Sequence, residues 1–212
     1  MGKFKDNLFH GHGTFIWDNG DIFDGYFING KKDGPGLLVL SSGGAYEGTW
    51  RNDLKHGIFK IQMNDGRYFE GNFYNNHMTG YGKVSVYITP SLKKSTYEKF
   101  TYEGYFINGI KNGIGKYTDS YDNTYEGYFK DDLKHGNGII NYSDGSMYIG
   151  RWKKGHKKGY GLFISDKGIV YEEYWKSQIR QNKKRLTPRK SIKETTANKI
   201  NIDNFSPLTP IL

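Results

Sequence analysis

The chain has no cysteine among its 212 residues and only five prolines. Without cysteine there is no disulfide, thiol nucleophile, iron–sulfur cluster or cysteine-ligated zinc site. No stretch approaches the roughly 20 apolar residues that a membrane-spanning helix needs, and the residues after Met1 are polar rather than a leader. We therefore expect a soluble protein of a reducing, cytoplasmic compartment, with no cofactor.

Glycine and aromatic residues are abundant instead, with 29 glycines and 17% Phe, Trp and Tyr. A helical bundle would avoid so many glycines, a collagen would place one at every third position, and a disordered chain would be poor in aromatic residues. The composition predicts β structure with frequent tight turns.

The sequence repeats itself with a period of 23 residues. An aromatic residue, which we number position 0, recurs at Phe23, Tyr46, Phe69, Tyr102, Tyr125, Tyr148 and Tyr171. All but one of the intervals are 23 residues; the interval from Phe69 to Tyr102 is ten residues longer. Glycine is typical at +2, +11 and +13, an aromatic residue at +4, and an apolar or aromatic residue at +15.

Each repeat is predicted to form one β-hairpin. Side chains alternate along a strand, so positions 0, +2 and +4 share one face of a first strand, and +11, +13 and +15 share one face of a second. Dipeptides such as Asn29-Gly30 and Asp131-Asp132 lie between them and tolerate the positive φ of a two-residue turn. The glycines are interpreted as room for the large rings of the neighbouring strand. Since one hairpin cannot bury its own apolar face, we predict an all-β fold, a single-layer twisted antiparallel sheet of stacked hairpins.

The pattern of Tyr125-Glu126-Gly127-Tyr128-Phe129 followed by His135-Gly136-Asn137-Gly138 resembles the MORN repeat family. The resemblance covers about residues 1–176, as about seven repeats of which the first is truncated. It implies a single-layer, curved sheet that bears a groove. It also implies scaffolding and membrane or cytoskeleton attachment rather than catalysis.

Several segments depart from the period. The first repeat lacks its leading aromatic residue, so either upstream repeats are missing from the sequence or the open edge pairs with another chain, giving a homodimer. The ten-residue insertion lies within 84–101 and is either an inert or a binding loop. Residues 172–185 are predicted to form a short capping helix, and residues 186–212 a disordered basic tail rich in Ser, Thr and Pro.

No catalytic or metal-binding pattern is evident. The Gly-Lys pairs lack the rest of a P-loop, and the histidines at +10 lie in different repeats, too far apart for one metal ion. A carboxylate row at +1, from Asp24 to Glu126, lies on the face opposite the rings. It is either a solvated face or a docking ladder for a basic helix. The sequence therefore predicts no enzyme.

The aromatic face is the main candidate site. A single layer has no second sheet to cover it, so the sequence predicts that some ring surface stays accessible, and an exposed apolar strip usually marks a partner site. We predict a scaffold that binds a partner helix or extended peptide, in a cytoskeletal or ciliary assembly. The predicted groove residues are Phe27, Tyr46, Trp50, Phe69, Phe73, Tyr102, Phe106, Tyr125, Phe129, Tyr148 and Trp152.

The net charge of +9 comes from one end of the chain. Residues 1–150 have a net charge of −1, and residues 151–212 have +10. The basic end is either a solvated tail or a peripheral tether to anionic phospholipid; without a recognised motif, no nucleic-acid partner is expected. The candidate lipid-binding residues are Lys153, Lys154, Lys157, Lys158, Lys183, Lys184 and Arg185, and the candidate phosphorylation sites are Thr187, Ser206 and Thr209.

Overall fold

The computed structural model describes residues 2–88 and 98–186, which fold entirely as β-strands and the turns that join them. The chain divides into two compact units, residues 1–110 and 111–212. The first holds β1 (Gly2–Lys5), β2 (Leu8–Ile16), β3 (Ile22–Ile28), β4 (Lys31–Val39), β5 (Gly44–Arg51), β6 (Leu54–Met63), β7 (Arg67–Tyr74), β8 (His77–Ile88) and β9 (Glu98–Ile107). The second holds β10 (Ile110–Thr118), β11 (Thr124–Lys130), β12 (Leu133–Asn141), β13 (Met147–Lys153), β14 (His156–Ile164), β15 (Val170–Lys176) and β16 (Ile179–Arg185).

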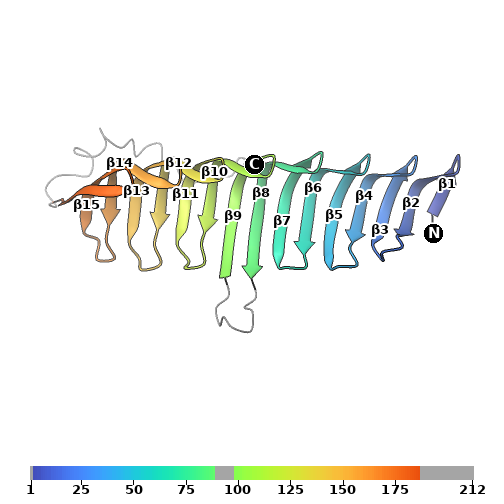
Figure 1. Cartoon of the computed structure of the whole chain (residues 1–212), viewed down its shortest axis with the longest axis horizontal. Coiled ribbons are helices and arrows are strands. Elements are labelled where there is room, and N and C mark those ends of the chain that lie inside the picture. Colours follow the sequence, from blue (N-terminus) through green and yellow to red (C-terminus); the bar gives the residue numbers. More distant parts are fainter. Residues whose placement is uncertain (1, 89–97, 187–212) are drawn as a thin grey trace. The chain divides into compact units, whose positions relative to one another are not determined.

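Within each unit the strands lie side by side in chain order and pair antiparallel with their neighbours in sequence (Figure 1). The register follows the repeat. In unit 1, Phe23 lies opposite Phe15 on one side and Leu38 on the other. The predicted all-β, single-layer antiparallel fold is confirmed.

The turns within the hairpins have the predicted left-handed backbone. Asn29 and Gly30 have φ of 50° and 80°, and Asp131 and Asp132 have φ of 51° and 66°. Asn, Asp and Gly adopt this conformation at the least cost among the residue types. The local sequence therefore sets where each hairpin reverses.

These turns also join successive repeats. The Asp53 N–H donates to the Lys32 carbonyl (2.9 Å), and the Asp53 carboxylate accepts from the Lys32 N–H (2.9 Å). Asp132 bonds Lys111 through the same two groups in unit 2. Each hairpin tip thus satisfies backbone groups of the hairpin before it.

A β-bulge interrupts the β1–β2, β3–β4, β5–β6, β7–β8, β11–β12, β13–β14 and β15–β16 hairpins. Between the pairs Trp152–Lys157 and Gly150–Gly161, the second strand of the hairpin advances four residues while the first advances two. The +11 glycine lies in the bulge, and Gly159 has φ of 70° there. Because such a backbone favours glycine, the +11 glycine recurs for a conformational reason, not to make room for rings.

The prediction of a capping helix over residues 172–185 is wrong. This segment forms most of the β15–β16 hairpin, whose turn residues Ser177 and Gln178 have φ of 49° and 69°. Tyr171, Glu173 and Trp175 continue the alternation of earlier repeats, so pairing with β14 outweighs the local preference for helix. The antiparallel pairing therefore extends beyond residue 176 to Arg185.

The insertion lengthens a hairpin on both sides. Residues 84–88 continue β8 and residues 98–101 belong to β9, where Val86 faces Phe100 and Ser85 faces Thr101. Residues 89–97 lie outside the described residues. The tail predicted for residues 186–212 also lies outside the described residues, apart from Leu186. The same holds for the candidate phosphorylation sites Thr187, Ser206 and Thr209.

Candidate binding face

The +2 and +13 glycines form a shallow pit in which the position-0 ring lies. A Cβ atom on Gly25 would come within 2.7 Å of the Phe23 ring, and one on Gly36 would meet the same ring. In unit 2, Gly138 and Gly127 relate to Tyr125 in the same way. The predicted packing role of glycine therefore holds at +2 and +13.

The rings of successive repeats contact one another edge to face. In unit 1, Phe23 lies 5.7 Å from Trp50, which lies 5.2 Å from Phe59. In unit 2, Trp152 lies 5.3 Å from Tyr125 and 5.8 Å from Tyr148. Such pairs contribute about 0.5–1.5 kcal/mol each beyond their buried area. The aromatic face is thus the hydrophobic core of each unit.

Most of the predicted groove residues are buried in this core. Nine of the eleven are buried, and only Tyr46 and Phe69 keep intermediate exposure. The indole N–H groups also form hydrogen bonds within the chain. Trp50 Nε1 donates to the Gly36 carbonyl (3.2 Å), and Trp152 Nε1 donates to the Gly138 carbonyl (3.3 Å). The surface that a partner meets therefore includes other residues on the same face.

Lysine supplies much of that surface. Position +9 is lysine in five repeats, and its side chain lies on the ring face because it pairs with the +4 aromatic residue, as Lys55 does with Trp50. We call this set the lysine row: Lys32, Lys55, Lys111, Lys134 and Lys157. The sequence analysis missed it, although the lysines recur in phase with the rings.

Members of the row lie over aromatic rings. Lys32 Nζ is 4.5 Å from the centroid of Trp50, Lys134 Nζ is 5.0 Å from Tyr125, and Lys157 Nζ is 3.9 Å from Tyr148. These are cation–π distances. The ammonium groups thus lie over the rings, and these lysines keep intermediate exposure.

Burial lowers the pKa of Lys32, Lys55 and Lys134 below the usual value, and that of Lys157 to about 8. Asp53, Asp119 and Glu173 raise the pKa of Lys32, Lys134 and Lys157 respectively, but burial outweighs them. For Lys55 the second cause is Lys32, which lowers its pKa further. Burial therefore disfavours the charged form of these four lysines, whereas Lys111 Nζ lies 3.6 Å from the Asp132 carboxylate.

Unit 1 departs from the pattern at two positions. Phe59 occupies a +13 position in place of glycine and is fully buried. Its ring approaches Gly48 and takes the place that the position-0 ring has in other repeats. Tyr46 is displaced and its hydroxyl donates to Met63 Sδ (3.4 Å). One repeat further, Met78 replaces the +9 lysine, and its methyl group fills the pit of Gly71 and Gly82.

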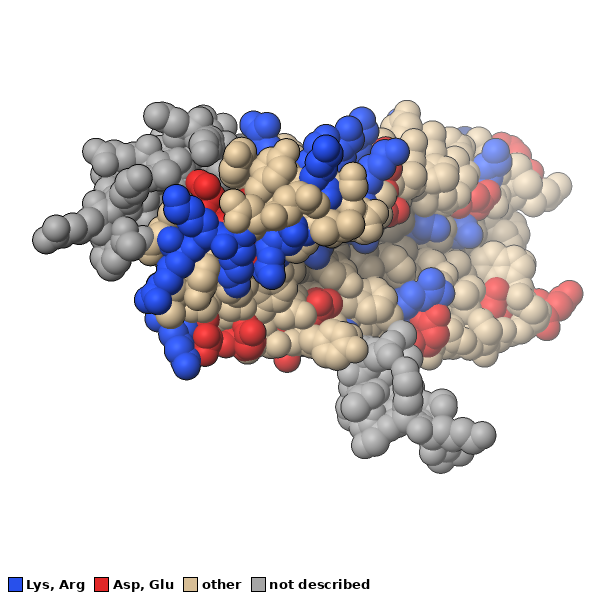
Figure 2. All heavy atoms as spheres, turned by 60° about the vertical axis from the view of Figure 1, so that its left-hand side comes forward, with Lys and Arg blue, Asp and Glu red and all other residues tan. Residues whose placement is uncertain are grey.

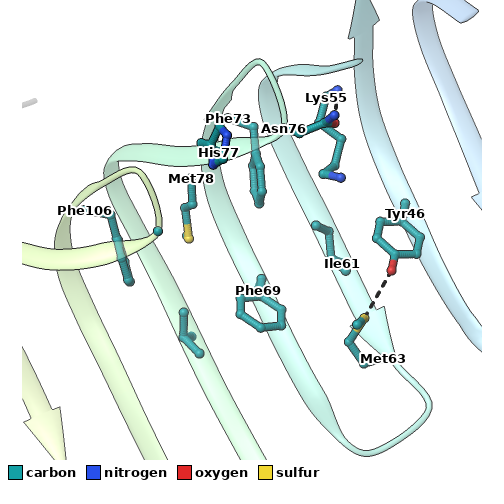
Figure 3. A pocket seen from close by; sticks show the side chains of 12 residues that line it. Tyr46, Lys55, Ile61, Met63, Phe69, Phe73, Asn76, His77, Met78 and Phe106 are labelled. Atoms are coloured by element: carbon teal, nitrogen blue, oxygen red, sulfur yellow. Dashed lines mark hydrogen bonds between the residues drawn. The ribbon is translucent and has the colours of Figure 1, made fainter. Parts of the chain in front are cut away.

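A cavity of about 250 Å³ opens on the ring face at this place. Phe69, Ile61 and Met78 lie on the same side of the sheet, between Tyr46 and Phe106 (Figure 3). Lys55, Asn76 and His77 are the polar residues around it. The irregular repeats thus create a mainly apolar recess that Lys55 also lines.

Comparison with known families matches this chain to the MORN repeat over residues 1–22, 23–45, 46–58, 69–84, 102–120, 125–147 and 148–170. The chain belongs to the MORN repeat family. MORN repeats are generally non-enzymatic scaffold modules that bind proteins or membranes. The comparison with curated proteins finds no match.

The family match has a gap at residues 59–68 that begins at Phe59, whereas Met78 of the second irregular repeat lies within the matched range 69–84. Among residues 2–88 and 98–186 no cluster of His, Asp and Glu could hold a metal ion. The same residues contain no helix long and apolar enough to cross a membrane.

The opposite face of the MORN array carries the predicted carboxylate row, but lysines at +14 alternate with it. Lys60 pairs with both Glu47 and Glu70, and Lys83 pairs with Glu70 and Glu103. In unit 2, Lys116 Nζ lies 2.8 Å from Glu126. Around Lys60, Lys83 and Lys116 the carboxylates of this face thus have lysines as neighbours, which favours the solvated-face interpretation over a docking ladder for a basic helix.

The basic residues at the end of unit 2 are divided between the two faces. Lys157 and Lys183 lie on the ring face, with Lys183 Nζ 4.2 Å from the Tyr171 centroid. Lys158 pairs with Arg151, and Lys184 with Glu172, on the opposite face. Figure 2 shows Lys and Arg side chains gathered at this end of unit 2. A cavity of about 590 Å³ is lined there by Lys153, Lys154, His156, Lys157, Lys158, Gly159, Tyr174, Trp175, Lys176, Ser177 and Gln178.

One buried carboxylate interrupts the ring face near the same end. Glu173 stands at the +2 position, where the preceding repeats have glycine, and is 1% exposed. It accepts hydrogen bonds from Trp175 Nε1 (3.0 Å) and Arg180 Nη1 (3.0 Å). The last repeat thus replaces the glycine pit with an ionic cluster.

Proposed function

We propose that this MORN protein is a scaffold or adaptor that holds a helix or extended peptide of a partner protein on the ring face. The observation that carries the proposal is the recess between Tyr46 and Phe106, the open apolar concavity of unit 1. Concave, mainly apolar sites with a few polar groups are typical of binding sites. Partner attachment within a cytoskeletal or ciliary assembly of the cytoplasm is part of the same proposal.

The test uses a photo-crosslinking amino acid at Tyr46, on the ring face, and at Tyr81, which is exposed on the opposite face. We expect the residue at position 46 to crosslink to a partner protein in cells, and the residue at position 81 not to crosslink to that protein. Adding Phe69→Ala should abolish capture from position 46, because Phe69 lines the recess and is not fully buried. Melting temperatures of each variant establish that the fold is kept.

The proposal fails if both positions capture the same proteins, or if capture survives Phe69→Ala in folded protein. A tagged copy then tests the assembly. Cytoskeletal or ciliary localisation that depends on Phe69 supports this part of the proposal, and diffuse localisation that Phe69→Ala does not change contradicts it.

A second candidate function is a peripheral tether to anionic membranes, favoured by the basic cavity of unit 2. Basic residues close to an anionic surface contribute about 1 kcal/mol each. The variant Lys154→Glu with Lys158→Glu should therefore lose binding to vesicles that contain phosphatidylserine. Lys60→Glu with Lys83→Glu is the control of equal charge change. Binding that ignores lipid charge, or falls equally in both variants, would contradict this function.

A further inference from the structure

We infer that the partner segment is an acidic α-helix whose carboxylates are seven residues apart and pair with Lys32 and Lys55, the two members of the lysine row in unit 1. In unit 1 its carboxylates meet Lys32 and Lys55, and a large apolar side chain one heptad further enters the recess beside Met78. This inference rests on the proposed function of the ring face and specifies its partner.

An acidic partner would complement the charge of Lys32 and Lys55. Their Nζ atoms lie on the ring face, 4.5 Å from the Trp50 centroid and 5.5 Å from the Tyr46 centroid, and burial lowers the pKa of both lysines. A carboxylate of a partner would compensate this charge, and hydrogen bonds between charged groups are the strongest class. On the opposite face Lys60 already has carboxylates as neighbours, because it lies opposite Glu47 on one adjacent strand and Glu70 on the other.

The spacing of the row selects a helix. Equivalent residues of successive repeats are two strands apart, which is about 10 Å. Seven residues of an α-helix rise about 10.5 Å and complete nearly two turns, so residues i and i+7 present side chains on one face. An extended peptide covers the same length in three residues, and residues i and i+3 of a strand point to opposite faces.

The recess specifies the third contact. Lys32 and Lys55 occupy +9 in successive repeats, and Met78 occupies the same position in the next. Met78 has no charge where the two preceding repeats have a lysine, and Phe69, Phe73 and Val84 line the cavity of about 250 Å³ beside it. The helix position that would carry a third carboxylate carries a leucine, methionine or phenylalanine instead.

An anionic membrane fits the row less well. The ammonium groups of Lys32 and Lys55 lie over rings, with Nζ 4.5 Å from the Trp50 centroid and 5.5 Å from the Tyr46 centroid, and both residues have intermediate exposure. Headgroups on a broad surface would contact fully exposed residues before these two lysines. Individual side chains of a helix can reach each ammonium group.

The test measures binding of labelled helical peptides to the full chain by fluorescence anisotropy. The first peptide has two glutamates seven residues apart, with a leucine seven residues before the first and another seven after the second, so either helix direction satisfies the site. The second has the same composition with the glutamates nine residues apart, on opposite helix faces. The third replaces both glutamates with glutamine.

We expect the first peptide to bind at least about tenfold more tightly than the second or third, as the loss of a charged hydrogen bond predicts. Lys55→Met, which keeps an unbranched side chain but removes the charge, should weaken its binding about tenfold. Lys60→Met is the matched control, since Lys60 lies on the same strand β6 and on the opposite face. It should leave binding unchanged, and added salt should weaken binding to the wild type.

Equal binding of the three peptides, binding of none, or no effect of Lys55→Met overturns the inference. Tight binding of the glutamine peptide that Phe69→Ala removes would leave the proposed function standing while the acidic helix fails. If Lys55→Met instead removes binding to phosphatidylserine vesicles or self-association, without changing peptide binding, the row serves a membrane or a second copy and the inference is wrong.

Discussion

At the scale of single residues, the glycines of one hairpin serve two purposes that composition does not separate. Gly161, at +13, has the Tyr148 ring where its Cβ would be. Gly159, at +11, has no atom within 4 Å of such a Cβ, but its φ is 70°. One glycine provides space for a ring, and the other provides a left-handed backbone at the bulge.

These roles predict different substitution patterns. Gly161→Ala should lower the free energy of unfolding by about 1–3 kcal/mol through overpacking, and Gly161→Asn by more. Gly159→Ala should cost about 1 kcal/mol through its positive φ, and Gly159→Asn less, since Asn tolerates this region. Urea denaturation of the four variants measures the effect. The assignment is wrong if asparagine rescues position 161 or is worse than alanine at 159.

Lys157 should titrate near neutral pH. Burial lowers its pKa to about 8 despite the nearby Glu173, and Arg180, Lys134 and Lys183 lower it as well. We expect the ¹³Cε resonance of Lys157 to shift with a midpoint near pH 8, below the ordinary lysine value of 10.5. A midpoint above pH 10 would show that its ammonium group is solvated.

The stability consequence has a defined sign. The pKa of Lys157 is about 8 in the folded chain, whereas the ordinary lysine value of 10.5 applies to the unfolded chain, so between these values the unfolded chain binds more protons. The folded state is therefore penalised below pH 8, and the penalty is relieved as pH rises toward 10.5. Lys157→Met removes it, so its stability relative to the wild type should be greatest below pH 8 and decline above. Urea denaturation across this pH range measures the difference, and a difference independent of pH would contradict the prediction.

At the scale of elements, the β15–β16 hairpin shows how an ionic cluster replaces the ring packing. Glu173 is held by Trp175 and Arg180, with Lys183 Nζ 3.9 Å away. β16 itself is exposed at every position, so these contacts and the backbone pairing attach it to β15. The hairpin depends on one buried carboxylate.

We predict that Glu173→Ala lowers the free energy of unfolding by about 2 kcal/mol, because it leaves two cations without their buried partner. The estimate is below the cost of breaking a fully buried pair, since Arg180 and Lys183 are 45% and 31% exposed. Glu173→Gln should cost less, because it keeps an acceptor for Trp175. Urea denaturation measures both variants beside Glu47→Ala, a control on the opposite face. A cost equal to that of the control would refute the role of Glu173.

At the scale of the whole molecule, every described strand pairs with strands adjacent in sequence. Stability in such arrays is the sum of terms from each repeat and its neighbours, so strands with one partner are the least protected. Among the described residues, β1 pairs with β2 alone and β16 with β15 alone. Every position of both strands is exposed.

Native-state hydrogen exchange should therefore show a gradient within each unit. Amides of β1 and β16 should exchange fastest, and those of β6 and β13, which have a strand on either side, slowest. Uniform protection along a unit would mean that it opens as one cooperative block. Protection of β1 that rises with protein concentration would support the predicted homodimer through this edge.

The repeat could be predicted from the amino-acid order, and so could the strands and turns of the hairpins before residue 172. These features are local: Asn29-Gly30 and its equivalents adopt positive φ without outside help, and alternation assigns each ring to one face. The rings of the candidate face could be predicted for the same reason, since they recur at fixed offsets from those turns. The recurrence of the glycines could be predicted in the same way, but their separate roles could not.

What that face presents to a partner depends on contacts between strands. Pairing places Lys55 opposite Trp50, and the bulge separates the glycines of +11 from those of +13. Phe59 occupying the ring position, and the recess beside Met78, depend on neighbours in other strands. Pairing with β14 likewise makes β15 a strand rather than a helix. Register and burial arise only when strands meet, so no single segment of the sequence contains them.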